Sequence, residues 1–280
     1  MLPLALAGLA VVLVWVAPGL LARQVRLRRA PRAALVAWQA VSLGGVLAAL
    51  FVAPAAVPEL LGGDPMADHP ALVALAAVAS IVVLARLLLS GHLVGTRVRA
   101  ARARHREIVD IVAEHDRGGV RVLQHPTATA YCIPGRSSRV VLSQGVLDTL
   151  PERQLDAVLA HEKAHLKARH DLLLEFFTVL HESVPPPLRS HRALTEVRLL
   201  VEALADRAAV RRSGEVATAR ALVAIAQGRY PDEAMGAGTS APVRMHLLAV
   251  GPHPVLSATA YLGAVVAVGA PVVLLSAAWS

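Results

Sequence analysis

The residues of this sequence that are best placed to do chemistry are His161, Glu162 and His165, spaced as His-Glu-x-x-His. On a helix, residues four positions apart lie on one face, so both imidazoles can bind the same metal ion. Glu162 then projects beside them, toward a water molecule at that metal. Leu155 and Val158 precede the motif at helical spacing, which is the context that it requires. The pattern predicts a catalytic zinc site with Glu162 as the general base.

A catalytic zinc with two histidine ligands needs a third protein ligand and one open position. Asp171 would supply the third ligand if the chain turned back on itself after His165. That turn calls for glycine at position 168, where the sequence has Ala168, so we expect the helix to run at least to Arg169 and to carry Asp171 away. His170 lies five residues beyond His165 and is expected to point off the ligand face.

Glu202 is the third candidate, on a helix predicted over residues 193–212. A carboxylate there would complete a site of two histidines and one glutamate. Asp206 follows one turn later on the same face and can accept the free N–H of a ligand histidine, which would fix its tautomer. The alternative is that Glu202 pairs with Arg198 on a solvated face, and spacing alone does not choose between the two.

The elements that must position these residues belong to a very apolar chain, with 55% hydrophobic and 17% charged residues. Soluble domains carry about a quarter charged residues, so the composition indicates a membrane protein. Four stretches reach the roughly 20 apolar residues that cross a bilayer, and they cover residues 2–21, 33–56, 70–94 and 254–278. We expect three transmembrane helices in residues 1–95, an inserted domain in 96–251 and the fourth helix in 252–280.

Arginines predict the orientation of these helices, because short loops rich in Lys and Arg stay in the cytoplasm. Five arginines follow the first span and five follow the third. The loop between spans two and three carries three acidic residues and no Lys or Arg; the acids are Glu59, Asp64 and Asp68. We therefore expect a multi-pass protein of the inner (plasma) membrane, with the lipid bilayer as a partner and the inserted domain in the cytoplasm. Arginine runs also occur in nucleic-acid-binding proteins. Their position beside the spans favours topology instead, and no direct nucleic-acid binding is expected.

The inserted domain is predicted to place a small sheet before a group of helices, which is the α+β class. The expected strands are 120–123, 127–133 and 139–143, and the expected helices are 107–115, 151–169, 193–212 and 215–227. The apolar stretch 172–180 is too short to span and is predicted to be packed core, with a membrane-dipping element as the alternative. Cys132 is the single cysteine and rules out an intrachain disulfide. Arg86, inside the third span, is expected to reach toward the cytoplasmic end.

Residues 161–171, followed by Glu202-Ala203-Leu204-Ala205-Asp206, resemble the gluzincin peptidases of the HtpX and CAAX-prenyl endopeptidase type. The order of three spans, zinc domain and final span resembles the BlaR/MecR-type antirepressor peptidases, and residues 130–135 resemble the strand that these families place beside the active site. The resemblance implies an α+β gluzincin zinc-metalloprotease domain inserted in a four-helix transmembrane scaffold. It implies one zinc ion on His161, His165 and Glu202, with Glu162 as base and Asp206 supporting a ligand. The sequence has no S-x-x-K motif and no penicillin-binding domain after the fourth span, so direct β-lactam sensing is not expected.

The resemblance also implies a protein substrate, such as a winged-helix repressor in the regulatory form of this chemistry. A quality-control or processing protease of HtpX type is a variant, and a non-proteolytic membrane receptor with a structural zinc is the alternative of another class. Glu162 favours the enzyme, because a structural zinc site has no use for a base. Arg244, His191 and Tyr131 are the candidates for stabilising the negative oxygen during hydrolysis. The strand at 127–133 is a candidate for binding substrate along its edge.

Overall fold

The computed structural model describes residues 2–61, 70–117, 119–228, 241–251 and 253–280. The chain divides into two compact units, which are described separately. The helical unit consists of the chain up to Leu93 together with Phe177–Val197 and His253–Ser280. The sheet unit consists of Val94–Phe176 and Arg198–Pro252.

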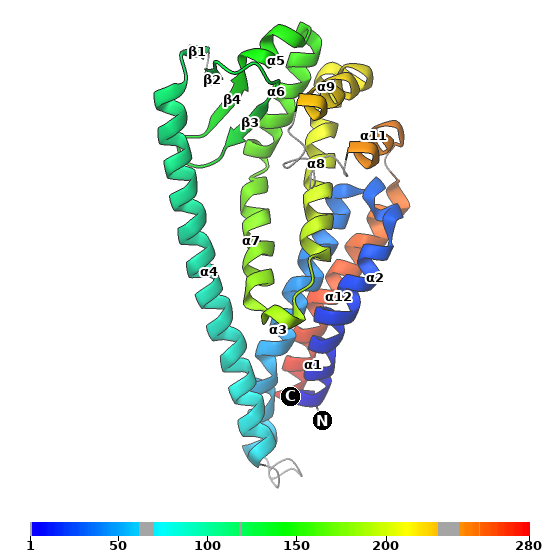
Figure 1. Cartoon of the computed structure of the whole chain (residues 1–280). Helices are drawn as coiled ribbons and strands as arrows, with labels where there is room; N and C mark the ends of the chain where they lie inside the picture. The colour runs from blue at the N-terminus through cyan, green and yellow to red at the C-terminus, as the bar shows by residue number, and fades with distance from the viewer. Residues whose placement is uncertain (1, 62–69, 118, 229–240, 252) are drawn as a thin grey trace. The chain divides into compact units, whose positions relative to one another are not determined.

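The helical unit is built from long apolar helices (Figure 1). In chain order they are α1 (Leu2–Val11), a π-helical turn η1 (Val12–Val16), α2 (Ala17–Arg23), the 3-10 turn η2 (Val25–Arg29), α3 (Pro31–Leu61), the first part of α4 (Pro70–Val112) and α12 (Pro254–Ala278). Four stretches of the described chain are long and apolar enough to cross a membrane: Leu2–Arg23, Pro31–Pro58, Ala74–Val112 and Pro254–Ala278. The predicted four apolar helices are therefore present. Asp64 and Asp68, which helped to predict the orientation, lie outside the described residues.

Small residues allow α3 and α12 to approach closely, as is usual for helices that pack in a bilayer. A Cβ at Gly44 would lie 2.1 Å from the carbonyl oxygen of Ala267, so only glycine fits at this crossing. Ala40, Ala264 and Ala267 are buried together with Leu13 from η1. The alanine-rich composition of these helices thus serves helix packing.

Arg86 on α4 has a partner within the helical unit. Its Nε donates to the carbonyl oxygen of Ser183 at 2.5 Å, in the last turn of α7 (His170–Ser183). A carbonyl left over at a helix end is a natural acceptor for arginine. This contact gives Arg86 a polar partner, and its reach toward the cytoplasmic end stays a prediction.

The charged segment after the third apolar stretch continues α4 to Val112 as one helix of 43 residues. A separate helix over 107–115 was expected, and that prediction is wrong. Arginine and alanine are strong helix formers, and they make up most of the segment that joins the apolar stretch to residue 107. The helix therefore continues without a break to Val112. His115–Arg117 instead form the short strand β1.

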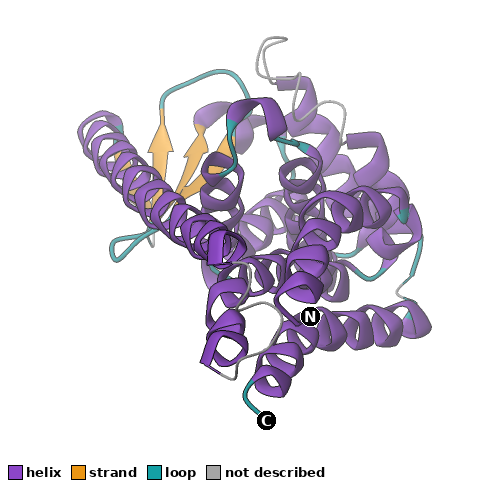
Figure 2. Ribbon diagram, turned by 90° about the horizontal axis from the view of Figure 1, so that it is seen from below, coloured by secondary structure: helices purple, strands orange, loops and turns teal. Residues whose placement is uncertain are grey.

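The sheet unit contains one four-stranded mixed sheet (Figure 2). Its further strands are β2 (Val120–Leu123), β3 (Ala130–Ile133) and β4 (Arg139–Ser143), in the order β1-β2-β4-β3. β2 and β4 are parallel, while β1–β2 and β3–β4 are antiparallel. β3 begins later than the predicted residue 127, because the Ser143 hydroxyl accepts from the backbone N–H of Thr129 and donates to the carbonyl of Thr127. β3 pairs only with β4 and is an edge strand.

Helices follow the sheet, which agrees with the α+β prediction for this part of the chain. They are α5 (Gln144–Thr149), α6 (Glu152–Lys167), α7, the 3-10 turn η4 (Pro186–Leu188), α8 (Arg192–Ser213), α9 (Glu215–Gly228) and α11 (Ala241–Ala249). α6 packs on the sheet through a buried core that includes Ala130, Leu142, Ala157 and Val158. Burial of such apolar side chains, at about 25 cal/mol per Å², is what holds the motif helix in place.

The motif helix ends two residues earlier than expected. α6 stops at Lys167, Arg169 adopts a left-handed conformation with φ 51°, and α7 begins at His170. The prediction that the helix continues to Arg169 rested on the absence of glycine at Ala168 and is wrong. An arginine in the left-handed region costs about 1–2 kcal/mol, and it makes the turn that a glycine was expected to make.

Candidate metal centre

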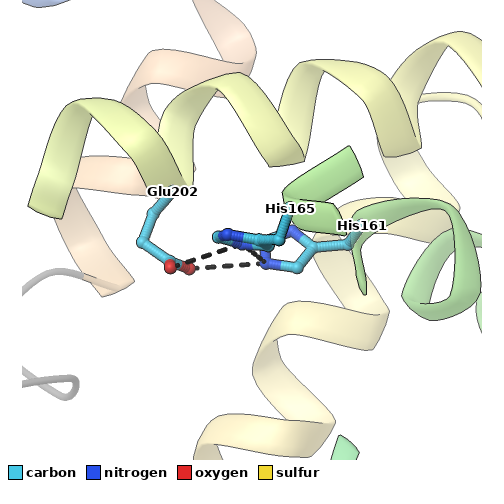
Figure 3. Close-up of side chains that lie close together, drawn as sticks. All are labelled: His161, His165 and Glu202. Atoms are coloured by element: carbon cyan, nitrogen blue, oxygen red, sulfur yellow. Dashed lines mark hydrogen bonds and ion pairs between the residues drawn. The ribbon is translucent and has the colours of Figure 1, made fainter. Parts of the chain in front are cut away.

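His161, His165 and Glu202 meet in the sheet unit (Figure 3). The two histidines come from α6 and the glutamate from α8, and one ligand atom of each lies within 4.8 Å of the others. The Nε2 atoms of the histidines are 3.1 Å apart, and they lie 3.4 and 3.5 Å from the carboxylate oxygens of Glu202. Two imidazole nitrogens and a carboxylate oxygen that converge in this way are the donor set of a catalytic zinc site. Among the described residues this is the one such cluster.

The core positions both helices of this cluster. On α6, Ala157 and Val158 are buried one turn before His161, which holds the motif face next to α8. On α8, Val201 is 1% exposed and precedes Glu202 directly, so the helix rotation is fixed by apolar packing. The alternative pairing of Glu202 with Arg198 on a solvated face is not what the structure shows, because Glu202 contacts His161, His165 and Arg244.

Asp206 supports the cluster from behind and is only 2% exposed. His161 donates from Nδ1 to Asp206 Oδ1 at 3.0 Å, so its other nitrogen, Nε2, faces His165 and Glu202. Asp206 also accepts from Arg244 Nε at 2.8 Å and from Nη2 at 2.6 Å. This is the contact that spacing along α8 suggested for Asp206, and it fixes the tautomer of His161 in the way that metal ligands usually need.

Arg244 on α11 contacts both carboxylates of α8. Besides its two bonds to Asp206, its Nη1 lies 3.0 Å from Glu202 Oε2. The guanidinium is buried, with the side chain 9% exposed. Arg244 was predicted only as one of three donors for a negative oxygen, and its structural role in holding Glu202 and Asp206 was not foreseen. The sequence offers no spacing rule that links α11 to α8.

Opposite charges in the cluster stabilise each other. Burial alone would lower the pKa of His161, but hydrogen bonds to Asp206 and Glu202 outweigh it and raise the pKa to about 9. Burial alone would raise the pKa of Glu202, but its hydrogen bond to His161 and the charges of His161 and Arg244 lower it to about 2. The site is thus built to hold positive charge next to two ionised carboxylates.

His170 contacts the ligand His165, contrary to the expectation that it points off the ligand face. Its Nδ1 is 3.1 Å from His165 Nδ1, and the residue is 4% exposed. The break at Arg169 is the reason, because the new helix starts with His170 turned back toward α6. Burial lowers the pKa of His165 to about 4 and also lowers the pKa of His170, so both rings are neutral at pH 7.

Asp171, the other ligand candidate on this stretch, takes part in an ion pair. Its Oδ2 accepts from Arg102 Nη1 of α4 at 3.1 Å. It is not part of the cluster of ligand atoms around His161. The expectation that Asp171 lies away from the metal position agrees with the structure, although the cause is the pairing with Arg102 and not a longer helix.

Glu162 lines a cavity of about 70 Å³ together with His161, Glu202, Asp206 and Arg244. Ala130 of β3 is also part of the wall. Cys132, also on β3, lies close to the carboxylate of Glu162. Burial, and then the charge of this carboxylate, raise the pKa of the Cys132 thiol. The general base predicted from the motif therefore faces the same cavity as the ligand cluster.

The other two predicted oxygen-stabilising candidates lie elsewhere. Tyr131 packs its ring against His105, with centroids 5.4 Å apart, and is not among the residues that line this cavity. His191 belongs to the helical unit, where its ring lies 4.5 Å from that of His181. Among the three, the structure brings only Arg244 into the cavity.

The chain combines several long apolar helices with a unit that holds a small sheet, helices and a cluster of possible metal ligands, which is the combination expected of a membrane-associated metalloprotease. The model of Peptidase family M48 matches residues 98–184. This is a gluzincin metallopeptidase family, and the match covers less than half of the chain. It includes His161, Glu162 and His165 and ends before Glu202. No curated protein and no solved structure matches the chain.

The match over residues 98–184 agrees with the predicted gluzincin class of metallopeptidase for that part of the chain. M48 peptidases depend on a metal ion, typically zinc, and the three converging ligands form a site suited to one. The finer assignment to the BlaR/MecR or HtpX type stays a prediction.

Proposed function

We propose that this protein is an integral-membrane zinc endopeptidase that hydrolyses peptide bonds in cytoplasmic or membrane-proximal proteins. The observation that carries the proposal is the convergence of His161, His165 and Glu202 beside a cavity that His161, Glu162 and Glu202 line. The long apolar helices support attachment to a bilayer. The match to Peptidase family M48 over the motif supports the reaction class.

One zinc ion would be held by Nε2 of His161, Nε2 of His165 and a carboxylate oxygen of Glu202. When bound, zinc would polarise the scissile carbonyl and lower the pKa of a water molecule at the site. The hydrogen bond from His161 Nδ1 to Asp206 and the contact of His165 with His170 orient the two rings for this role. Arg244 holds Asp206 and Glu202 in place from the other side.

Glu162 would act as the general base. Glu162 lines the cavity, where it would take a proton from the attacking water and deliver it to the leaving amine. A structural metal site would not need a carboxylate directly after a ligand histidine and beside the same cavity. The neutral state of His165 at pH 7, caused by burial, leaves a lone pair on its ring for a metal ion.

The edge strand β3 is suited to bind the substrate in extended form. β3 pairs with β4 on one side only, so its other side offers backbone groups to an incoming strand. Ala130, at the start of β3, lines the cavity, and Cys132 lies close to Glu162. A peptide added to β3 would pass the base, which supports cleavage within a chain.

We further propose that the enzyme resides in the plasma membrane with the protease domain in the cytoplasm, as the arginines after the first and third spans predict. Its substrate would be a regulatory protein such as a winged-helix transcriptional repressor. Cleavage of damaged or precursor membrane proteins is the variant with the same chemistry. The order of spans and zinc domain supports the regulatory form by resemblance to the BlaR/MecR type.

The experiment compares cells that carry wild-type protein, Glu162→Ala and the matched variant Glu152→Ala. Glu152 is an exposed acid at the start of the same helix. Glu162→Ala should bind zinc normally but lose cleavage by a factor of about 10²–10⁴, because a general base is missing. Glu152→Ala should retain both. Proteomics would detect the fragments that depend on Glu162, and a repressor among them would support the regulatory form.

Zinc bound at full occupancy together with unchanged fragments in Glu162→Ala cells would refute the enzyme. The non-proteolytic receptor with a structural zinc would then be the better account. Fragments that come only from membrane proteins would support the processing variant over repressor cleavage.

A further inference from the structure

A second cavity lies in the helical unit, and none of its lining residues belongs to the metal cluster. Its volume is about 450 Å³, within the range of sites for small ligands. Ala22 at the end of α2 forms one wall. The loop before α8 and the first turns of α8 form the rest, with residues 189–192, Thr195 and Glu196.

The lining of this cavity carries an excess of positive charge. Arg189 and Arg192 face one acid, Glu196. That acid is neutralised by Arg28 of η2, whose Nε donates to Glu196 Oε2 at 3.0 Å and whose Nη2 contacts the other oxygen. Within the described part of the chain, the Arg192 guanidinium forms no ion pair of its own. A cavity with this balance favours an anion.

Arg189 is held in a fixed orientation beside the cavity. Its Nε donates to the carbonyl of Val184 at 2.8 Å, and its Nη2 donates to the carbonyl of Glu182 at 2.9 Å. These two bonds leave further N–H groups of the guanidinium for a ligand. A neighbouring histidine is affected by the positive charge here. Burial, and then the charges of His191 and Arg189, lower the pKa of His181.

The position of the cavity along the helices places it at the edge of the apolar layer. Ala22 is the last residue before the basic flank that starts at Arg23. A Cβ on Gly19 of α2 would lie 3.5 Å from Arg192 Nη1, so the Arg192 guanidinium lies next to Gly19. Gly19 precedes Arg23 by four residues, which is about 6 Å along the helix toward the apolar part. Charged groups at such depth require polar partners, and headgroup phosphates are the anions found there.

We propose that this cavity binds a phosphate group through Arg192 and Arg189, and that anionic phospholipid headgroups supply it. Arginine matches phosphate geometry with two parallel N–H donors. Ser190, His191 and Thr195 line the cavity and add uncharged donors. A free phosphate ion would share this chemistry, so the source has to be separated by experiment.

The test uses the purified full chain in a neutral detergent and measures binding of short-chain phosphatidylglycerol, phosphatidylcholine and inorganic phosphate by native mass spectrometry. Wild-type protein should bind phosphatidylglycerol at least tenfold more tightly than phosphatidylcholine, whose choline offsets the phosphate charge. Arg192→Gln should weaken phosphatidylglycerol binding about tenfold, since it removes a charged hydrogen bond. The matched variant Arg212→Gln, on the last turn of the same helix and 70% exposed, should bind as wild type does.

Equal losses in Arg192→Gln and Arg212→Gln would mean attraction by general surface charge and would overturn the proposal. Equal binding of the two lipids by wild type would also overturn it, as would the absence of binding of both phosphatidylglycerol and inorganic phosphate. Displacement of the lipid by an equal concentration of inorganic phosphate would support the phosphate site and correct its source. Arg192→Lys covers the case in which Arg192→Gln does not fold, and it should retain the preference for phosphatidylglycerol at reduced affinity, because it preserves charge but not the paired donors.

Discussion

The replacement Asp206→Asn should weaken zinc binding without touching a metal ligand. Asp206 accepts three hydrogen bonds, two from Arg244 and one from His161 Nδ1. Asparagine has the same size but only one carbonyl oxygen, and its NH₂ group would face an N–H donor. At least one donor is then left without an acceptor, and His161 loses the charge that orients its ring.

The size of the effect follows from these contacts. A hydrogen bond to a charged group contributes about 1.5–3 kcal/mol, and Asp206 is only 2% exposed, so little of the loss is recovered by water. Arg244 keeps its contact with Glu202 at 3.0 Å, which limits the cost of an unpaired buried charge. Loss of a residue that orients a ligand histidine typically lowers metal affinity 10–100-fold. We expect a zinc dissociation constant raised by that factor and a lower unfolding temperature of the zinc-free protein.

Zinc competition with a chromophoric chelator at fixed pH measures the affinity, and thermal unfolding of the purified protein measures stability. The matched control is Asp156→Asn on α6, which makes the same charge change at a side chain that is 47% exposed and contacts Arg212 only at 4.0 Å. This control should stay within about 0.5 kcal/mol of wild type. Equal zinc affinities for the Asp206 and Asp156 variants would refute the role assigned to the Asp206–His161 contact.

Three further outcomes are expected. Glu202→Ala should lower the zinc content of the purified protein below one ion per chain by metal analysis, and normal occupancy would point to another ligand. Zinc affinity should rise by up to tenfold per pH unit up to about pH 9 and then level off. The reason is that zinc must displace the proton of His161, whose pKa is raised to about 9. Proton release measured by calorimetry in two buffers checks this, and a zinc affinity that does not change with pH would contradict it. Gly145→Ala should destabilise the sheet unit by about 1–3 kcal/mol, since its Cβ would lie 2.0 Å from the carbonyl oxygen of Pro126. The control is Gly251→Ala, where a Cβ meets nothing within 4 Å, and similar unfolding temperatures for both variants would count against the packing argument.

Features with a local cause in the sequence could be predicted. The motif residues His161 and His165 lie on one helix face because a four-residue spacing requires it, and the structure brings them together. The apolar helices follow from the length of the apolar runs, and the strands Val120–Leu123 and Arg139–Ser143 follow from short β-branched runs between turn residues. Spacing along the helix made Glu202 a candidate third ligand but did not exclude its pairing with Arg198. Only the fold, which brings α8 to α6, decides between the two.

Features that depend on one backbone angle or on distant packing could not be predicted. Arg169 adopts a left-handed conformation that few non-glycine residues adopt, so the turn that brings His170 to His165 carries no sequence signal. The contact of Arg244 with Asp206 joins residues 38 positions apart through packing of α11. The strand β1 was missed because the end of α4 had been assigned to a helix of its own.

The charges of the site explain why its residues suit a divalent cation. Among the described residues, three carboxylates line the cavity, from Glu162, Glu202 and Asp206, together with one permanent cation, Arg244. Without a metal, the raised pKa of His161 adds one proton and still leaves the group one charge short of neutrality. A zinc ion that replaces this proton brings the same residues to neutrality, because the two ligand imidazoles are then uncharged. Burial makes unbalanced charge costly, so a monovalent ion would leave the cavity negative and a divalent ion satisfies it.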